Sequence, residues 1–148
     1  MMTRRTFSLA LAALWGSRQL LAQPTATLDS LVWALDTIAW EPDDPPGSKY
    51  AVLHGDRDRP GTLFTYAFLL PGGVWAPPHV HSQAAHVAVL KGTLKLGFGT
   101  TANRGLARSI PAGQFFMVPG NQPHFEGSDD QCLIVGTAMG GWKTTVVG

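Results

Sequence analysis

The sequence has little charge and almost no cysteine. Charged residues make up 14% of the 148 residues, and the formal net charge is +1. Because no strong field exists to attract nucleic acid or membrane phosphates, we expect neither as a partner. Cys132 is the single cysteine, which excludes an intramolecular disulfide. It lies in an apolar run, and we interpret it as a buried hydrophobic residue rather than a reactive thiol.

A hydrophobic run long enough to cross a membrane is also missing from the N-terminal region. Arg4 and Arg5 precede a short apolar stretch at residues 10–16, and Arg18 follows it. A membrane-spanning helix needs about 20 apolar residues, so we expect no membrane anchor. Paired arginines before a short apolar stretch are typical of a twin-arginine signal, and we predict an export signal at residues 1–22 and a periplasmic or secreted protein. A Sec-type signal and an amphipathic first helix are the alternatives.

Glycine and proline, by contrast, are plentiful, with 17 and 11 residues scattered between short apolar runs. This pattern is typical of turn-rich all-β proteins. The clearest strand signal is at residues 62–70, where Phe64, Tyr66 and Phe68 alternate and should share a core face. We predict further strands at residues 49–54, 74–81, 86–90, 93–98, 108–110, 115–118, 132–137 and 142–147.

The chain before residue 49 is harder to interpret from its pattern. Residues 31–40 are apolar without a firm period, and we interpret them as a strand, with a short helix as the alternative. Residues 41–48 have the composition of a loop. We therefore predict an N-terminal extension and loop at residues 23–48, followed by one β-barrel or β-sandwich domain at residues 49–148.

Histidine is the residue type that points to chemistry. His79 and His81 are two positions apart on a predicted strand, so their side chains leave the same face. His124 follows a turn further along the chain. Imidazole is the commonest protein ligand for transition metals, although a His-x-His pair can equally be two surface or hydrogen-bonded histidines. His54 stands alone at a strand end, and we interpret it as structural or exposed.

The residues around these histidines resemble the two sequence motifs of the cupin superfamily. Residues 73–92 contain a Gly, five residues, His-x-His and a closing Gly, as in the first motif. Residues 113–124 contain a Gly, five residues, Pro-x-Gly and a final His, as in the second motif, but with Asn121 in place of its second Gly. Asn is the residue that best tolerates the left-handed conformation after Gly. The chain also looks like a group of small exported one-domain cupins.

The resemblance covers residues 49–147 and implies a double-stranded β-helix, or jelly-roll, barrel. It also implies one divalent transition metal (Fe, Mn, Zn, Ni or Cu) in the barrel mouth, held by His79, His81 and His124. The chain departs from the motif at one position, because the expected Glu falls on Ala85 when counted back from Gly92. His86 is one residue further on. We predict that His86 is a fourth ligand through a shift in strand register; the alternative is that Ala85, Val87 and Val89 face inward.

Three or four neutral histidines leave the full positive charge on a divalent metal, which favours Lewis-acid and oxygen chemistry. We therefore predict a metal-dependent enzyme, of oxygenase type, that acts on a small molecule. The alternative is a non-catalytic module that binds a metal or a small ligand. The predicted assembly is a homodimer. Glu126 is the acidic residue nearest to His124 in sequence, and whether it shares a face with His124 depends on a regular strand at that point.

Overall fold

The computed structural model describes residues 32–148. The predicted export signal at residues 1–22 lies outside the described residues and stays a prediction. Residues 33–148 form one compact unit made almost entirely of antiparallel strands. Among the residues that the structure describes, no helix is long and apolar enough to cross a membrane.

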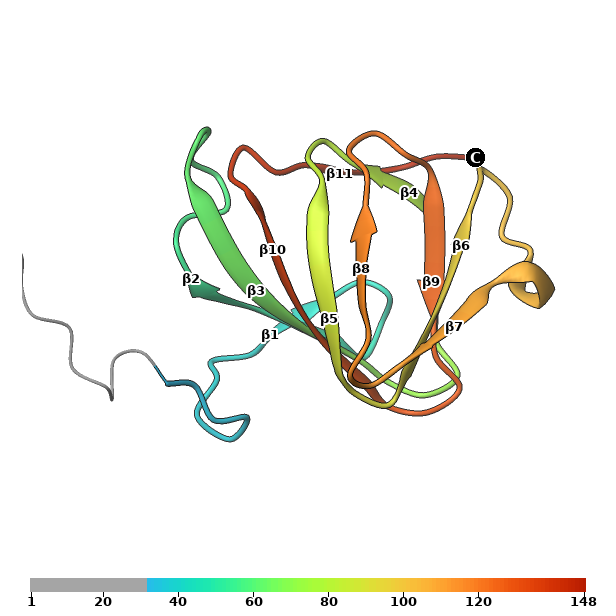
Figure 1. The fold of residues 1–148 in the computed structure, drawn as a ribbon, viewed down its shortest axis with the longest axis horizontal. Helices are drawn as coiled ribbons and strands as arrows, with labels where there is room; N and C mark the ends of the chain where they lie inside the picture. The colour runs from blue at the N-terminus through green and yellow to red at the C-terminus, as the bar shows by residue number, and fades with distance from the viewer. Residues whose placement is uncertain (1–31) are drawn as a thin grey trace, which may run out of the picture. The chain divides into compact units, whose positions relative to one another are not determined.

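The first of two sheets has six strands (Figure 1). In spatial order they are β1 (Glu41–Asp43), β2 (Ser48–His54), β3 (Leu63–Leu70), β10 (Cys132–Met139), β5 (Ala85–Lys91) and β8 (Phe115–Val118). All neighbours are antiparallel. The strand β10 therefore comes from near the C-terminus and lies between two earlier strands, β3 and β5.

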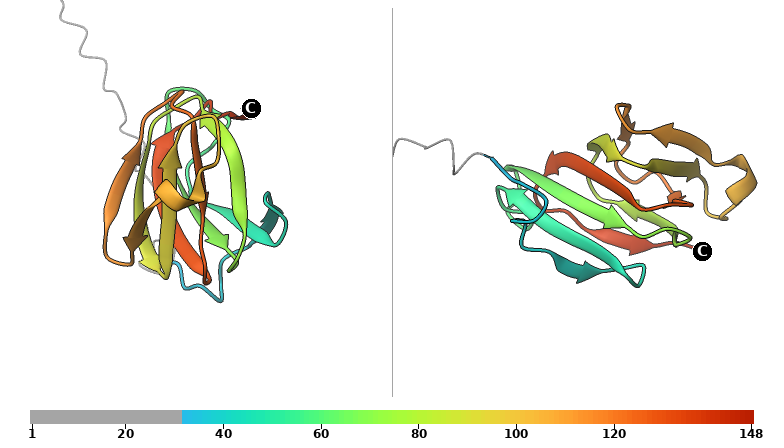
Figure 2. Two further views of the ribbon diagram at one scale, coloured as in Figure 1. Left: turned by 90° about the vertical axis from the view of Figure 1, so that its right-hand side faces the viewer. Right: turned by 90° about the horizontal axis from the view of Figure 1, so that it is seen from below.

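The second sheet has five strands and faces the first (Figure 2). In spatial order they are β11 (Thr144–Val146), β4 (Trp75–His81), β9 (His124–Gly127), β6 (Thr93–Phe98) and β7 (Arg108–Pro111). A short 3-10 helix, η2 (Arg104–Leu106), precedes β7. From β3 to β6 and again from β7 to β11, successive strands alternate between the two sheets. This is the arrangement of a jelly roll, and the predicted all-β barrel is confirmed.

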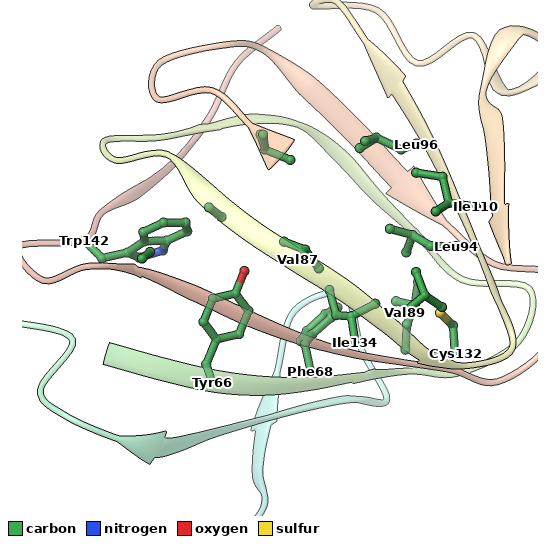
Figure 3. Packing of buried hydrophobic residues seen from close by; sticks show 14 of the residues in the cluster. Tyr66, Phe68, Val87, Val89, Leu94, Leu96, Ile110, Cys132, Ile134 and Trp142 are labelled. Atoms are coloured by element: carbon green, nitrogen blue, oxygen red, sulfur yellow. The ribbon is translucent and has the colours of Figure 1, made fainter. Parts of the chain in front are cut away.

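The hydrophobic core lies between the two sheets (Figure 3). Phe64, Tyr66 and Phe68 are all buried, as their alternation in sequence predicts. Figure 3 shows Trp142 and Tyr66 toward one end of this core and the aliphatic side chains Leu94 and Ile110 toward the other. Aliphatic side chains thus fill one end of the barrel, and the cavity described below lies at the aromatic end.

Cys132 is buried in this core, at 1% exposure, as predicted. Burial, with a smaller contribution from the Glu126 carboxylate, raises the pKa of its thiol to about 11. The thiol is therefore protonated at neutral pH, as an unreactive cysteine should be.

The N-terminal part of the described chain differs from prediction. Residues 32–40 contain no strand, because the Thr37 amide and hydroxyl both donate to the Ala34 carbonyl (3.0 and 2.9 Å) and close a turn. The predicted loop at residues 41–48 contains β1, which pairs with β2 through a turn closed by the Ser48 amide and the Pro45 carbonyl. The barrel sheet therefore begins before the boundary drawn at residue 49.

Candidate metal centre

Two adjacent strands bring three histidines together. His79 and His81 lie two apart on β4, and His79 is directly opposite His124 of β9. The ring centroids are 4.2 Å apart for His79 and His124, 4.8 Å for His79 and His81, and 4.9 Å for His81 and His124. One ring nitrogen from each histidine lies within 4.8 Å of the others. The three imidazoles are close enough for one ion to contact all three.

A bulge in β4 produces this register. Ala76 is opposite Glu126, and the next pair of opposite residues is His79 with His124. β4 therefore advances three residues where β9 advances two. The extra residue falls at Pro77 and Pro78, which have no N–H groups to continue the ladder. Because residues directly opposite each other share a face, the bulge is what allows Ala76, His79 and His124 all to face inward.

The hydrogen bonds of the rings determine which nitrogen each histidine can offer. The Nδ1 atoms of His79 and His124 lie 2.8 and 2.9 Å from the backbone carbonyls of Pro77 and Gln122. A carbonyl only accepts, so each Nδ1 carries the proton, and Nε2 keeps its lone pair. His81 Nδ1 lies 3.0 Å from the Thr144 hydroxyl. This is the arrangement that orients metal-binding histidines in proteins.

The cluster has the properties that a divalent transition metal requires. His124 Nε2 is buried and has no hydrogen-bond partner. Burial lowers the pKa of His124, and burial together with the neighbouring His79 and His124 lowers the pKa of His81 to about 3. Both rings are therefore neutral at physiological pH. A neutral imidazole with a free Nε2 is the form that binds Fe, Mn, Zn, Ni or Cu, and an unpartnered buried nitrogen is costly without such a ligand.

The prediction that His86 is a fourth ligand is wrong in this structure. Residues 85–88 of β5 pair in regular register with both β8 and β10, so no bulge shifts the strand at His86; the register shift against β10 lies beyond Val89. Ala85 and Val87 face the core, whereas His86 is exposed on the outer face opposite Met117. The alternative count, with Ala85, Val87 and Val89 inward, is confirmed. Asn121 has the predicted left-handed conformation, with φ of 58°, and His54 is exposed.

The three histidines line one cavity of about 640 Å³ at the aromatic end of the barrel. The aromatic side chains in its wall, besides the histidines, are Tyr50, Tyr66, Phe68, Trp75, Phe116 and Trp142. The Trp142 ring lies 4.3 Å from that of His81. Ala85 also lines the cavity. It occupies the position of the motif's Glu, so this position faces the same cavity as the histidines but offers no carboxylate.

Sequence reasoning missed several functional candidates in this cavity. Arg57 belongs to a loop with the composition of a solvated segment, but it lines the cavity. Thr144 is 63 residues from its partner His81, and no local pattern links them. Glu126, whose face depended on a regular strand at that point, also lines the cavity, because β9 is such a strand and places it on the face of His124. The sequence did not predict β9, because this strand is only 4 residues long and ends in a glycine.

Comparison with known proteins agrees with the fold. The family model described as Cupin matches residues 55–138, more than half of the chain. Germin-like protein subfamily 2 member 1 of Arabidopsis thaliana is 46% identical over 57 residues, which are 38% of this chain and 26% of that protein. The chain spans about a quarter of the length of the first curated relatives that it matches.

Solved structures show the same fold at low sequence identity. An uncharacterized conserved protein with a double-stranded β-helix domain from Klebsiella pneumoniae has a TM-score of 0.62 at 16% identity, covering 84% of this chain and 98% of that one. The salicylate 1,2-dioxygenase from Pseudoaminobacter salicylatoxidans has a TM-score of 0.58 at 16% identity, covering 73% of this chain and 31% of that one. These matches establish the architecture.

Proposed function

Because the chain belongs to the cupin family, we propose that it is a metal-dependent enzyme of oxygenase type that acts on a small molecule. One observation carries this proposal. Three imidazoles, two with Nδ1 held by backbone carbonyls, converge on the wall of a cavity large enough for a small molecule. Since the fold hosts many activities, the argument rests on the site rather than on the architecture.

His79, His81 and His124 would hold the metal through Nε2, with Thr144 orienting His81. When bound by three neutral imidazoles, a divalent metal supplies a Lewis acid of full charge with coordination positions still open. Apolar side chains in the cavity wall, such as Ala85, Val118 and Trp142, reduce the contact of the site with water. Glu126 is the carboxylate on the His124 strand inside the cavity, and it can accept a proton from a bound substrate.

Oxygen consumption tests the oxygenase proposal. Purified protein loaded with ferrous iron should consume oxygen with at least one member of a panel of β-diketones, thiols, catechols and aromatic acids. The His81→Ala variant should lose that activity, whereas His86→Ala should keep it, because His86 lies on the outer face. Saturable metal binding without oxygen consumption across the panel would instead indicate the non-catalytic binding module. Assembly as a homodimer stays a prediction.

We also propose export through a twin-arginine signal at residues 1–22, on the support of Arg4 and Arg5 before the apolar stretch. Replacing both arginines with lysine keeps the charge and removes the guanidinium donors. The double variant should accumulate as cytoplasmic precursor in a bacterial host. Normal periplasmic delivery of that variant would favour a Sec-type signal.

A further inference from the structure

We propose that Arg57 is the anion-binding residue of the cavity, and that the ligand is a small planar carboxylate held between Arg57 and the histidine cluster. The inference rests on the proposed function in taking the histidine-lined cavity as the ligand site. It adds the chemical class of the ligand and the residue that selects it.

The backbone holds Arg57 at the cavity wall. Arg57 lies in the loop between β2 and β3, and its carbonyl accepts hydrogen bonds from the amides of Gly141 (2.9 Å) and Trp142 (3.2 Å). Trp142 in turn packs against His81, with ring centroids 4.3 Å apart. Figure 3 shows Trp142 at the same end of the core as Tyr66. The loop that carries the cation is therefore tied to the residue that covers one candidate ligand of the metal.

Arg57 is the single Lys or Arg side chain that lines this cavity. It is half-buried, and within residues 32–148 the one ion pair is that of Lys95 with Asp129. The guanidinium carbon lies 5.2 Å from the centre of the Tyr50 ring, within the range of a cation–π contact. The planar fork of guanidinium N–H donors matches the two oxygens of a carboxylate.

Three carboxylates line the cavity together with this cation. Asp43 and Asp44 are exposed, so water screens their charges. Glu126 is half-buried on β9, two residues from His124, whereas the Arg57 carbonyl is hydrogen-bonded to the amide of Trp142, which packs against His81. The backbone thus ties the cation to the Trp142 side of the cavity and the half-buried carboxylate to the His124 strand. A carboxylate ligand is favoured at the first side and disfavoured at the second.

The walls between these sides determine the shape of the ligand. Tyr50 and Tyr66 stack at 5.6 Å with planes 24° apart, and Trp142 lies 6.1 Å from Tyr66. Such flat surfaces bind planar rings better than branched aliphatic groups, through offset stacking. A volume of about 640 Å³ lies within the range of small-molecule sites. These features together indicate an aromatic or conjugated carboxylate.

Binding of benzoate and of its neutral isostere benzamide tests the proposal by isothermal titration calorimetry. Wild-type, Arg57→Gln, Arg57→Lys and Arg59→Gln proteins are compared, each metal-free and zinc-loaded. Arg59 is the matched control, because it lies two residues away in the same loop, is exposed and does not line the cavity. Wild type and Arg59→Gln should prefer benzoate by about tenfold or more. Arg57→Gln should lose that preference, and Arg57→Lys should retain part of it.

Equal affinity of wild type for the two probes, absence of saturable benzoate binding, or an unchanged preference in Arg57→Gln would each overturn the proposal. Zinc content measured on the same samples separates it from the proposed function. Normal zinc binding without a carboxylate preference overturns the role of Arg57 and leaves the metal centre. A carboxylate preference that depends on Arg57 in protein unable to bind zinc overturns the metal centre and leaves Arg57.

Discussion

At the scale of single residues, the three Nδ1 hydrogen bonds divide the histidines into two kinds. His79 and His124 are oriented by backbone carbonyls of their own strands or turns, which a side-chain substitution does not remove. His81 is oriented by the Thr144 hydroxyl, from the edge strand β11. The orientation of His81 therefore depends on one replaceable side chain.

Thr144→Val should lower metal affinity by about tenfold, because loss of a hydrogen bond to a ligand histidine typically costs tenfold or more. Thr144→Ser keeps the hydroxyl and should restore the affinity. Thr145→Val is the matched control, since Thr145 is the exposed neighbour on the same strand and pairs with Val80 rather than with a histidine. Competition titration with a chromogenic zinc chelator measures all three. If Thr144→Val and Thr145→Val behave alike, Thr144 has no positioning role.

The neighbouring residues Ala85 and His86 give a second test, because they face opposite sides of β5. Replacing the inward Ala85 with Glu adds a carboxylate to the wall of the histidine-lined cavity. It should strengthen divalent metal binding by about tenfold, through the added negative charge. His86→Ala should leave affinity unchanged. The same chelator titration measures both variants. A loss of metal affinity in His86→Ala would contradict the outward orientation of His86.

At the scale of strands, the features set by local sequence could be predicted, whereas those set by the register between distant strands could not. Strand alternation alone places His79 and His81 on one face, and the turn chemistry around Asn121 predicts its left-handed conformation. The pairing of His79 with His124 depends on the bulge at Pro77 and Pro78, which no period in the sequence reveals. Long-range register also explains why the prediction for His86 is wrong. Its spacing of five residues from His81 suggests a metal ligand, but the pairing of residues 85–88 with β8 and β10 turns its side chain to the outer face.

The pairing of β2 with β3 gives a prediction about pH. Tyr50 and Tyr66 are the two tyrosines of the whole chain. Burial raises the pKa of Tyr50 from 10.0 to about 12, against the opposing effect of Arg57, and burial followed by the Glu126 carboxylate also raises the pKa of Tyr66. In the native protein, phenolate absorbance should therefore be nearly absent at pH 10.5 and should appear at once on unfolding.

The sign of the linked stability follows from the same shift. A pKa that is higher in the folded state means that the folded protein holds the proton more tightly, so the stabilisation is complete below the unfolded value of 10.0. It is lost as the pH rises from there toward about 12. Urea denaturation at pH 8, 9, 10 and 11 should show a falling free energy of unfolding at the last two values. Tyrosine ionisation near pH 10 in folded protein would contradict the burial of both phenols.

At the scale of the whole molecule, the barrel divides its interior between stability and chemistry. One end is filled by aliphatic side chains from both sheets (Figure 3). The other end holds the cavity with the histidines, Arg57 and Glu126. The histidines lie on β4 and β9, and the Thr144 hydroxyl that orients His81 lies on β11, near the C-terminus. The histidine cluster therefore requires the pairing of β4 with both β9 and β11.

Metal content is the measurement that tests the central claim most directly. The protein has five histidines, three in the cluster and two, His54 and His86, exposed elsewhere. After reconstitution and removal of loose metal, elemental analysis of wild-type protein and of a His54→Ala, His86→Ala double variant should each give about one divalent metal per chain. A His79→Ala, His81→Ala, His124→Ala triple variant should give almost none. Equal metal content in the triple variant, or no metal in the wild type, would contradict the account.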